Sequence, residues 1–241
     1  VHQLGQSGDR SIIPALIKVL RDDDWRVREA AALALAQLKA VAAVPAMLET
    51  LRHARSGPFG GGSQTKSILQ AIRDVGPASL PVLIDALSDE EPRIRHMIVD
   101  LLGDIGDADA VPALIMTLHD PESRVRWRAA DALGRMGNAS AVPDLLAMLK
   151  DQDSEARITA AWALGQIGHA SAVKGLIAML HDREWRTRWA AVQALWEIGE
   201  DALPELIASL HDRNEYVRNA AARAIVEIGE PAVESLIATL G

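Results

Sequence analysis

The feature that most constrains this chain is a segment that recurs along nearly its whole length. The central copy is Asp120–Gly137, DPESRVRWRAADALGRMG. Related copies begin at Asp89, Asp151, Asp182 and Asp212, so the spacing from one copy to the next is almost constant. A fixed period of roughly 30 residues is typical of proteins built from stacked structural repeats, so it is interpreted before any other motif.

Each repeat unit predicts a pair of helices. The first helix carries apolar residues at the i, i+3, i+4, i+7 spacing of an amphipathic helix, and in most units it has proline in its first turn, where the missing N–H costs nothing. The predicted first helices are Ile12–Leu20, Ala43–Leu51, Leu80–Leu87, Ala110–Leu118, Ala141–Leu149, Ala172–Leu180 and Ala202–Leu210. A polar turn beginning with aspartate leads to the second helix, which ends at glycine, a common left-handed helix stop. Because neither helix can bury its apolar stripe alone, the units must stack.

The composition supports an all-α fold and excludes several classes of protein. Apolar residues make up 49% of the chain and are mostly Ala, Leu, Ile and Val, which favours helix over strand. There is no cysteine, which excludes disulfides and thiolate metal sites. The net charge of −8 argues against a nucleic-acid partner. No apolar run approaches the roughly 20 residues of a membrane span, and no signal-like segment is recognisable, so we expect a cytoplasmic protein without membrane contact.

Two units depart from the pattern. In the first, Lys39 stands where later units have glycine, and in the second the turn between the helices expands to Arg52–Gln64, RHARSGPFGGGSQ. A phosphate-binding loop requires Lys and then Ser or Thr directly after its last glycine. Here Ser63-Gln64 follows Gly62, so we interpret the insertion, residues 52–64, as a mobile surface loop. The chain begins within a second helix and ends after a first helix, so we interpret residues 1–241 as a single array of about seven full units from a longer protein.

Helix endings of the form Ala-Ala-x-Ala-Leu-Gly-x-Ile-Gly and turns of the form Asp-x5-Arg resemble HEAT repeats of the short phycobilisome-lyase type. The resemblance implies a right-handed α-solenoid, with first helices on the convex side and second helices lining the concave side. It also implies that the turn aspartate and the helix arginine form a structural ladder between neighbouring repeats. The pairs with this spacing are Asp22/Arg28, Asp89/Arg95, Asp120/Arg126, Asp151/Arg157, Asp182/Arg188 and Asp212/Arg218.

All six tryptophans are predicted on one face of the second helices. On a helical wheel of about 100° per residue, the repeated apolar positions cluster on one side, as Val125, Ala129 and Leu133 do in the central unit. The tryptophans fall on the opposite side, and exposed aromatic side chains gathered on one face are typical of an interaction site. Trp25 stands apart from the others. The predicted partner-binding residues of the concave groove are Asp100, Trp127, Asp131, Ile158, Trp162, Trp185, Trp189, Gln193, Trp196, Asn219 and Arg223.

Polar residues share this face of the second helices. Three of them could form a metal site: His96, Asp100 and Asp131. Stacked helices stand about 8–10 Å apart, which is far for shared ligation, and such sites need three or four converging ligands. We therefore prefer a solvated polar rim, and we predict no metal and no other cofactor.

Three classes of function fit such an array. We prefer a non-catalytic scaffold that holds a protein or peptide segment, because repeat folds supply extended binding surfaces more often than reaction centres. The alternative is a bilin- or tetrapyrrole-handling protein similar to phycobilin lyases, in which the aromatic patch stacks the chromophore. A HEAT-type di-iron hydroxylase is the third class, but that activity resembles one built on His-Glu dyads, and no His-Glu dipeptide occurs here. We expect no enzymatic activity.

Overall fold

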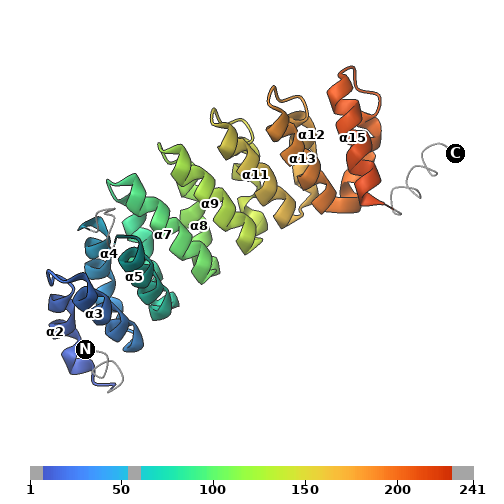
Figure 1. The fold of residues 1–241 in the computed structure, drawn as a ribbon. Coiled ribbons are helices and arrows are strands. Elements are labelled where there is room, and N and C mark those ends of the chain that lie inside the picture. The colour runs from blue at the N-terminus through green and yellow to red at the C-terminus, as the bar shows by residue number, and fades with distance from the viewer. Residues whose placement is uncertain (1–7, 54–60, 230–241) are drawn as a thin grey trace. The chain divides into compact units, whose positions relative to one another are not determined.

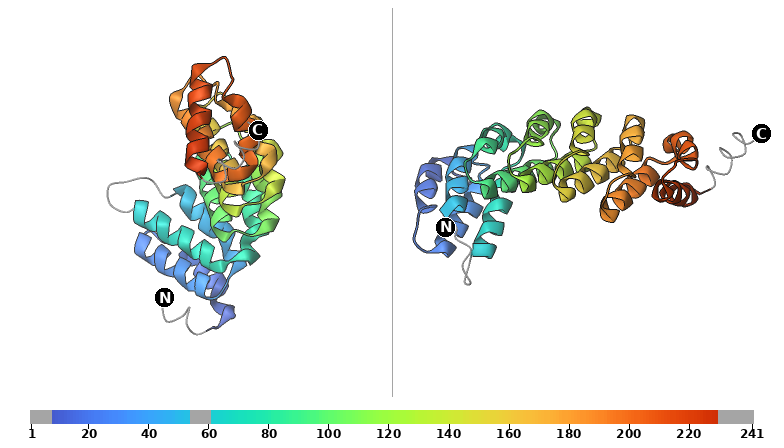
Figure 2. Two further views of the ribbon diagram at one scale, coloured as in Figure 1. Left: turned by 90° about the vertical axis from the view of Figure 1, so that its right-hand side faces the viewer. Right: turned by 90° about the horizontal axis from the view of Figure 1, so that it is seen from above.

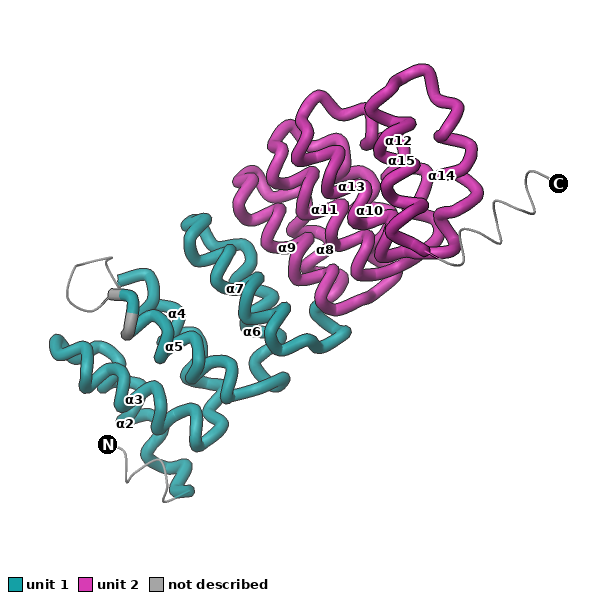
Figure 3. The backbone as a smooth tube through the Cα atoms, turned by 45° about the vertical axis from the view of Figure 1, so that its right-hand side comes forward, with its two compact units in different colours: residues 1–110 teal, residues 111–241 magenta. Residues whose placement is uncertain are grey.

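The structure, a computed structural model, describes residues 8–53 and 61–229. The chain divides into two compact units, residues 1–110 (unit 1) and residues 111–241 (unit 2), which are described separately (Figure 3). Every regular element in the described ranges is a helix. Within each unit the helix pairs stack in chain order (Figures 1 and 2). The prediction of an all-α repeat solenoid is confirmed.

Seven predicted first helices lie where the sequence predicts them. The further first helix predicted at residues 231–240 lies outside the described residues. Each described first helix buries at least one large apolar side chain, such as Leu83 in unit 1 and Leu114 in unit 2. The first helices are α2 (Ile13–Val19), α4 (Val44–His53), α6 (Leu80–Asp85), α8 (Val111–Thr117), α10 (Val142–Met148), α12 (Val173–Met179) and α14 (Leu203–Ser209). Short 3₁₀ turns precede them: η1 (Arg10–Ile12), η2 (Val41–Ala43), η3 (Pro77–Ser79), η5 (Ala108–Ala110), η6 (Ala139–Ala141), η7 (Ala170–Ala172) and η8 (Gly199–Ala202), while η4 (Ala86–Ser88) extends α6.

The second helices are longer, and those other than α5 have defined caps at both ends. They are α3 (Trp25–Gln37), α5 (Gly61–Val75), α7 (Pro92–Ile105), α9 (Ser123–Met136), α11 (Ser154–Ile167), α13 (Trp185–Ile198) and α15 (Glu215–Ile228). At the start of α11, the Asp153 carboxylate accepts hydrogen bonds from the N–H groups of Glu155 and Ala156, which would otherwise lack partners inside the helix. At the end of α9, Gly137 adopts a left-handed conformation with φ 64°, as the sequence predicts.

Lys39 adopts the left-handed conformation that glycine has in the later repeats. Its φ is 50°, the only positive φ of a non-glycine residue in the described ranges. A side chain in this conformation crowds the following carbonyl oxygen, at a cost of roughly 1–2 kcal/mol. The Lys39 ammonium donates a hydrogen bond to the carbonyl oxygen of Asp74, near the end of α5. The lysine therefore ends its own helix and also links α3 to the next repeat.

The loop prediction for residues 52–64 is wrong at both of its ends. Helix α4 continues through His53, and α5 begins at Gly61, while residues 54–60 lie outside the described residues. Gln64 is 3% exposed, and its side-chain oxygen accepts a hydrogen bond of 3.0 Å from Arg28 Nη2. Gly61 and Gly62 lie in the first turn of α5, so a high glycine content did not by itself mark a loop.

Successive second helices of unit 2 approach each other closely at glycine. A Cβ atom added to Gly134 of α9 would lie 2.8 Å from Ala163 Cα of α11, and one added to Gly165 of α11 would lie 2.8 Å from Ala194 Cα of α13. Real Cβ atoms do not approach backbone this closely, so glycine is required at both positions. The two glycines let α9, α11 and α13 form the most extensive helix packing in the described structure.

Candidate protein-binding surface

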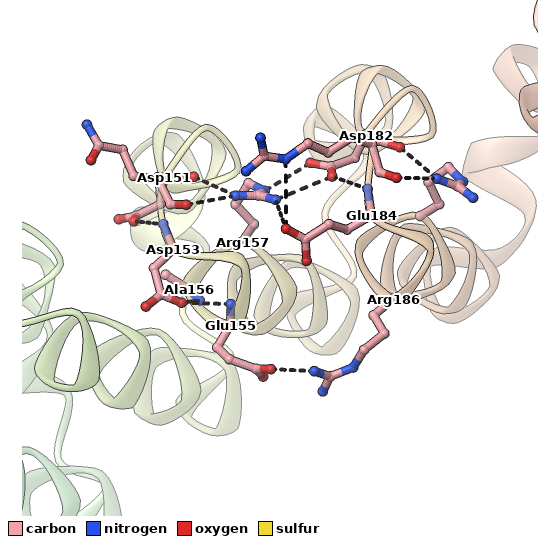
Figure 4. A network of polar contacts seen from close by, with 11 residues as sticks. Asp151, Asp153, Glu155, Ala156, Arg157, Asp182, Glu184 and Arg186 are labelled. Atoms are coloured by element: carbon pink, nitrogen blue, oxygen red, sulfur yellow. Dashed lines mark hydrogen bonds and ion pairs between the residues drawn. The ribbon is translucent and has the colours of Figure 1, made fainter.

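The turn aspartates and helix arginines form the ladder that the resemblance implies. Arg126 donates to both carboxylate oxygens of Asp151 in the next repeat, from Nε at 2.7 Å and Nη2 at 2.8 Å. Arg157 repeats the arrangement with Asp182, at 2.9 Å and 3.3 Å (Figure 4). Nη1 of Arg157 also donates to the carbonyl oxygen of Asp151 in its own turn, at 2.9 Å. These charges therefore tie turns to helices and repeats to each other.

The ladder perturbs the ionisation of Asp151. Burial by itself raises the pKa of this carboxyl, but the hydrogen bonds from Arg126 and from the N–H of Asp153, with the nearby charges of Arg126 and Arg157, outweigh it. The pKa of Asp151 lies below its usual value of 3.8 as a result. The lowered pKa therefore has a structural cause, the contacts of the ladder.

Different residues take the ladder positions where the repeat is irregular. In unit 1, Gln64 accepts from Arg28 in place of the missing turn aspartate, and Arg52 Nε donates to Asp89 at 2.9 Å. In unit 2, which keeps the Asp/Arg spacing, the Arg188 guanidinium also lies 4.8 Å from the centre of the Tyr216 ring in the next repeat. The second repeat is thus linked to both of its neighbours although it lacks the Asp/Arg pair.

Four of the predicted tryptophans are exposed on the second helices of unit 2. Trp162 of α11 is 41% exposed, and on α13 Trp189 is 42%, Trp196 44% and Trp185 68% exposed. These values are high for the largest apolar side chain, which is usually well buried in a folded protein. The wheel correctly separates these four side chains from the core stripe of their helices.

The other two tryptophans are half-buried. The Arg128 guanidinium lies 4.6 Å from the centre of the Trp127 ring, and the Arg26 guanidinium lies 5.7 Å from that of Trp25. In both cases the tryptophan ring makes a cation–π contact with the arginine that follows it in the chain. Trp127 is therefore partly covered by its neighbour and offers less free surface than Trp162 or Trp189.

The placement of Ile158 in the exposed patch is wrong. Ile158 is 2% exposed, although it occupies the same position in α11 as Trp189 occupies in α13. Helix α11 lies between α9 and α13 and is packed closely against both of them. Its flanks are buried as well as its core stripe, so a side chain of moderate size there does not reach solvent.

The side chains of Asp131, Trp162, Gln166, Trp189, Gln193 and Glu197 line one pocket, which we call the acidic pocket; Thr159 and Ala163 complete its lining. Its volume is about 300 Å³. The three second helices α9, α11 and α13 supply all of these residues. A larger open depression of about 700 Å³ lies beside it, and it shares Gln166 and Glu197 and includes Trp196.

The remaining predicted residues differ in how strongly they are held. Asp131 is half-buried and pairs with Arg135 Nε at 3.3 Å. Arg223 Nε lies 3.2 Å from Glu227 Oε1, and Gln193 donates to the other oxygen of Glu227 at 3.3 Å. Asn219 of α15 is exposed.

Asp100 belongs to unit 1, and Trp196 makes a hydrogen bond to the next repeat. Asp100 lies on α7 of unit 1 and is half-buried, so it is described apart from the residues of unit 2. The Trp196 indole N–H donates to the carbonyl oxygen of Glu227 at 3.0 Å, which links α13 to α15. Trp196 therefore has a packing role as well as an exposed ring.

Sequence reasoning missed Gln166, Glu197, Tyr216 and Val226. The first two line the acidic pocket, and Tyr216 and Val226 are 65% and 78% exposed. Val226 holds the position in its helix that Trp196 holds in α13, so the wheel contained the signal to find it. Gln166 and Glu197 lie one position beyond that face, and their pocket depends on contacts between helices that a wheel does not represent.

The described residues also bear on a metal site and on a membrane-spanning helix. Residues 8–53 and 61–229 contain no group of three or more His, Asp or Glu side chains arranged to hold a metal ion. None of the helices in the same ranges combines the length and hydropathy needed to cross a lipid bilayer.

Two-helix repeats stacked in chain order define the α-solenoid class. The sequence profile of HEAT repeats matches residues 1–58, 66–127, 114–196 and 173–241. These segments cover nearly the whole chain, so the chain belongs to the HEAT-repeat family. No curated protein sequence matches the chain.

Several solved structures are similar to this chain. Kap121p matches 92% of this chain with a TM-score of 0.60 and 14% identity, and the match spans 30% of that protein. An engineered protein matches with 23% identity, 91% and 97% coverage of the two chains, and a TM-score of 0.49. The CpcE–CpcF complex of phycocyanin lyase from Nostoc sp. PCC7120 matches with 23% identity, 92% and 86% coverage, and a TM-score of 0.40. At 14% identity the likeness to Kap121p shows the fold alone.

Proposed function

We propose that the chain is a non-catalytic scaffold that binds a protein or peptide segment along the second helices of unit 2. The observation that carries the proposal is the exposure of Trp162, Trp185, Trp189 and Trp196 on two neighbouring helices. Tryptophan is among the side chains most enriched at binding hot spots, and clustered exposed apolar surface usually marks an interaction site. The HEAT-repeat fold is consistent with this role because stacked repeats offer extended surfaces.

The finer assignment to the phycobilisome-lyase type of HEAT repeat belongs to the same proposal, since it rests on the repeat endings and turns of the sequence. A bilin-handling role is the alternative. It would require a pocket that encloses a conjugated ring system, and it predicts visible absorbance in the purified protein. We favour the scaffold because the depressions on this face are open and do not enclose a ligand.

Selection of peptides from a displayed random library tests the proposal. Peptides that bind the wild-type chain are measured against the double variant Trp162→Ala/Trp189→Ala. At a hot spot each change typically removes about 2 kcal/mol or more of binding energy, close to thirtyfold in affinity. Both rings are over 40% exposed, so the melting temperature should fall far less than for a buried tryptophan, which costs about 3–5 kcal/mol.

Trp25→Ala is the matched control, because Trp25 lies in unit 1 and is half-buried. It should leave the affinity of the selected peptides unchanged. Binding that survives the double change, or that is lost equally in Trp25→Ala, would contradict the proposed surface.

A further inference from the structure

The acidic pocket carries two carboxylates and two indole rings, and none of its lining residues is basic. Asp131 on one side engages Arg135 through one contact of 3.3 Å, and both of these side chains remain about 40% exposed or more. Trp162 and Trp189 contribute ring surface, while Gln166 and Gln193 contribute amide groups that donate and accept hydrogen bonds. The combination of negative charge and aromatic surface is complementary to a cation.

Glu197 is the less satisfied of the two carboxylates. Within the described structure it has no hydrogen-bond or ion-pair partner, although Arg186 and Arg223 on α13 and α15 pair with Glu155 and Glu227. Partial burial raises the pKa of Glu197 above its usual value of 4.5, and no positive charge offsets this effect.

The position of the Glu197 carboxylate depends on Gly165. Glu197 Oε2 lies over Gly165 of α11, where any side chain on residue 165 would displace it. The glycine that allows α11 and α13 to pack closely therefore also provides the space in which this carboxylate lies beside the indole rings.

We propose that the acidic pocket receives an arginine side chain from an extended segment of the protein partner, with its guanidinium between the Trp162 and Trp189 rings and the Glu197 carboxylate. The proposal rests on the proposed function and adds the chemistry of the partner. Arginine fits better than lysine because its planar guanidinium stacks on aromatic faces and donates paired hydrogen bonds to a carboxylate. The pocket volume of about 300 Å³ suits one long side chain rather than a folded domain.

The test uses the whole chain labelled with nitrogen-15 and the probe peptide acetyl-Gly-Arg-Gly-amide. The control probes replace arginine by citrulline, its neutral analogue, or by lysine. The indole N–H signals of Trp162 and Trp189 should shift with the arginine probe, several-fold less at equal concentration with lysine, and not with citrulline. The Trp25 signal should not move.

Glu197→Gln removes the charge that the proposal requires. Glu200→Gln removes an equal charge from a residue that is exposed, as Glu197 is, but lies outside the pocket. Glu197→Gln should weaken binding of the arginine probe by about tenfold or more, the value of a hydrogen bond to a charged group. Glu200→Gln should leave binding unchanged. Equal weakening in both variants would mean general attraction to an acidic chain and would overturn the proposal, as would equal binding of citrulline or lysine.

The peptide selection separates this inference from the proposed function. Selected peptides that depend on Trp162 and Trp189 and contain a required arginine support both. Peptides that depend on the tryptophans and tolerate replacement of every arginine leave the scaffold intact and overturn the arginine site. Absence of any peptide that depends on the tryptophans overturns both.

Discussion

At the scale of single residues, the substitution Gly165→Ala opposes two effects on the stability of the fold, the helix propensity of alanine and the close packing of α11 against α13. Alanine is the better helix former by up to about 1 kcal/mol. In Gly165→Ala the new methyl group would lie 2.8 Å from Ala194 Cα, so α11 and α13 must separate, and overpacking of this kind costs about 1–3 kcal/mol. We expect a net loss of stability, measured as a lower midpoint of urea denaturation.

Gly62→Ala is the control for this change. Gly62 lies in α5, and an added Cβ there would meet nothing within 4 Å. The same substitution should leave the midpoint equal to that of the wild type or raise it slightly. A gain of stability in Gly165→Ala would show that the second helices separate without cost.

At the scale of helices, the ladder should stabilise the junctions between repeats. Arg157 is 7% exposed, and Asp182→Asn removes the charge that faces it in the next repeat. A hydrogen bond to a charged group typically contributes about 1.5–3 kcal/mol, so we expect a loss of that size in the free energy of unfolding. Denaturation followed by circular dichroism measures it.

Glu155→Gln supplies the comparison, since the Glu155–Arg186 pair joins the same two repeats but is about half exposed on both sides. An exposed pair contributes roughly 0–1 kcal/mol. If Asp182→Asn lowered the free energy of unfolding by no more than Glu155→Gln does, the ladder would not stabilise the junctions between repeats.

The ladder should also make the junction around Asp151 sensitive to acid. The pKa of Asp151 is lowered in the folded chain, so its contribution to stability is present above the unfolded pKa of about 3.9 and is lost as the pH falls through the lower folded pKa. The difference in unfolding free energy between wild type and Asp151→Asn should be constant from about pH 5 to 8 and shrink below about pH 4. A difference that persists unchanged at pH 3 would contradict the assignment.

At the scale of the whole molecule, the two compact units should fold independently. Each has its own core, which includes Leu51, Ile72 and Leu83 in unit 1 and Leu133, Leu164 and Leu195 in unit 2. Fragments 1–106 and 107–241, divided after the glycine that ends α7, should each give a helical circular dichroism spectrum. Fragment 107–241 alone should bind the selected peptides. A disordered spectrum for either fragment would show that the units depend on each other.

The sequence by itself determined the helix pairs. The nearly constant repeat period located the first helices of the described residues, and the terminal glycines located the ends of the second helices from α7 on, because proline and glycine act through local backbone geometry. It also separated the four exposed tryptophans from the core stripe, since a helix has one fixed period. The ladder was also predicted, because the family resemblance implies contacts between repeats for a turn aspartate and a helix arginine at this spacing.

Only the tertiary structure decided which side chains outside the core stripe of the second helices remain exposed to solvent. Ile158 and Trp189 hold the same position in their helices, yet Ile158 is buried and Trp189 is exposed. The acidic pocket, with Gln166 and Glu197, arises where α9, α11 and α13 meet. A wheel assigns each side chain to one face of one helix, whereas exposure in a stacked array depends on how closely the neighbours on both sides approach, which here is set by Gly134 and Gly165.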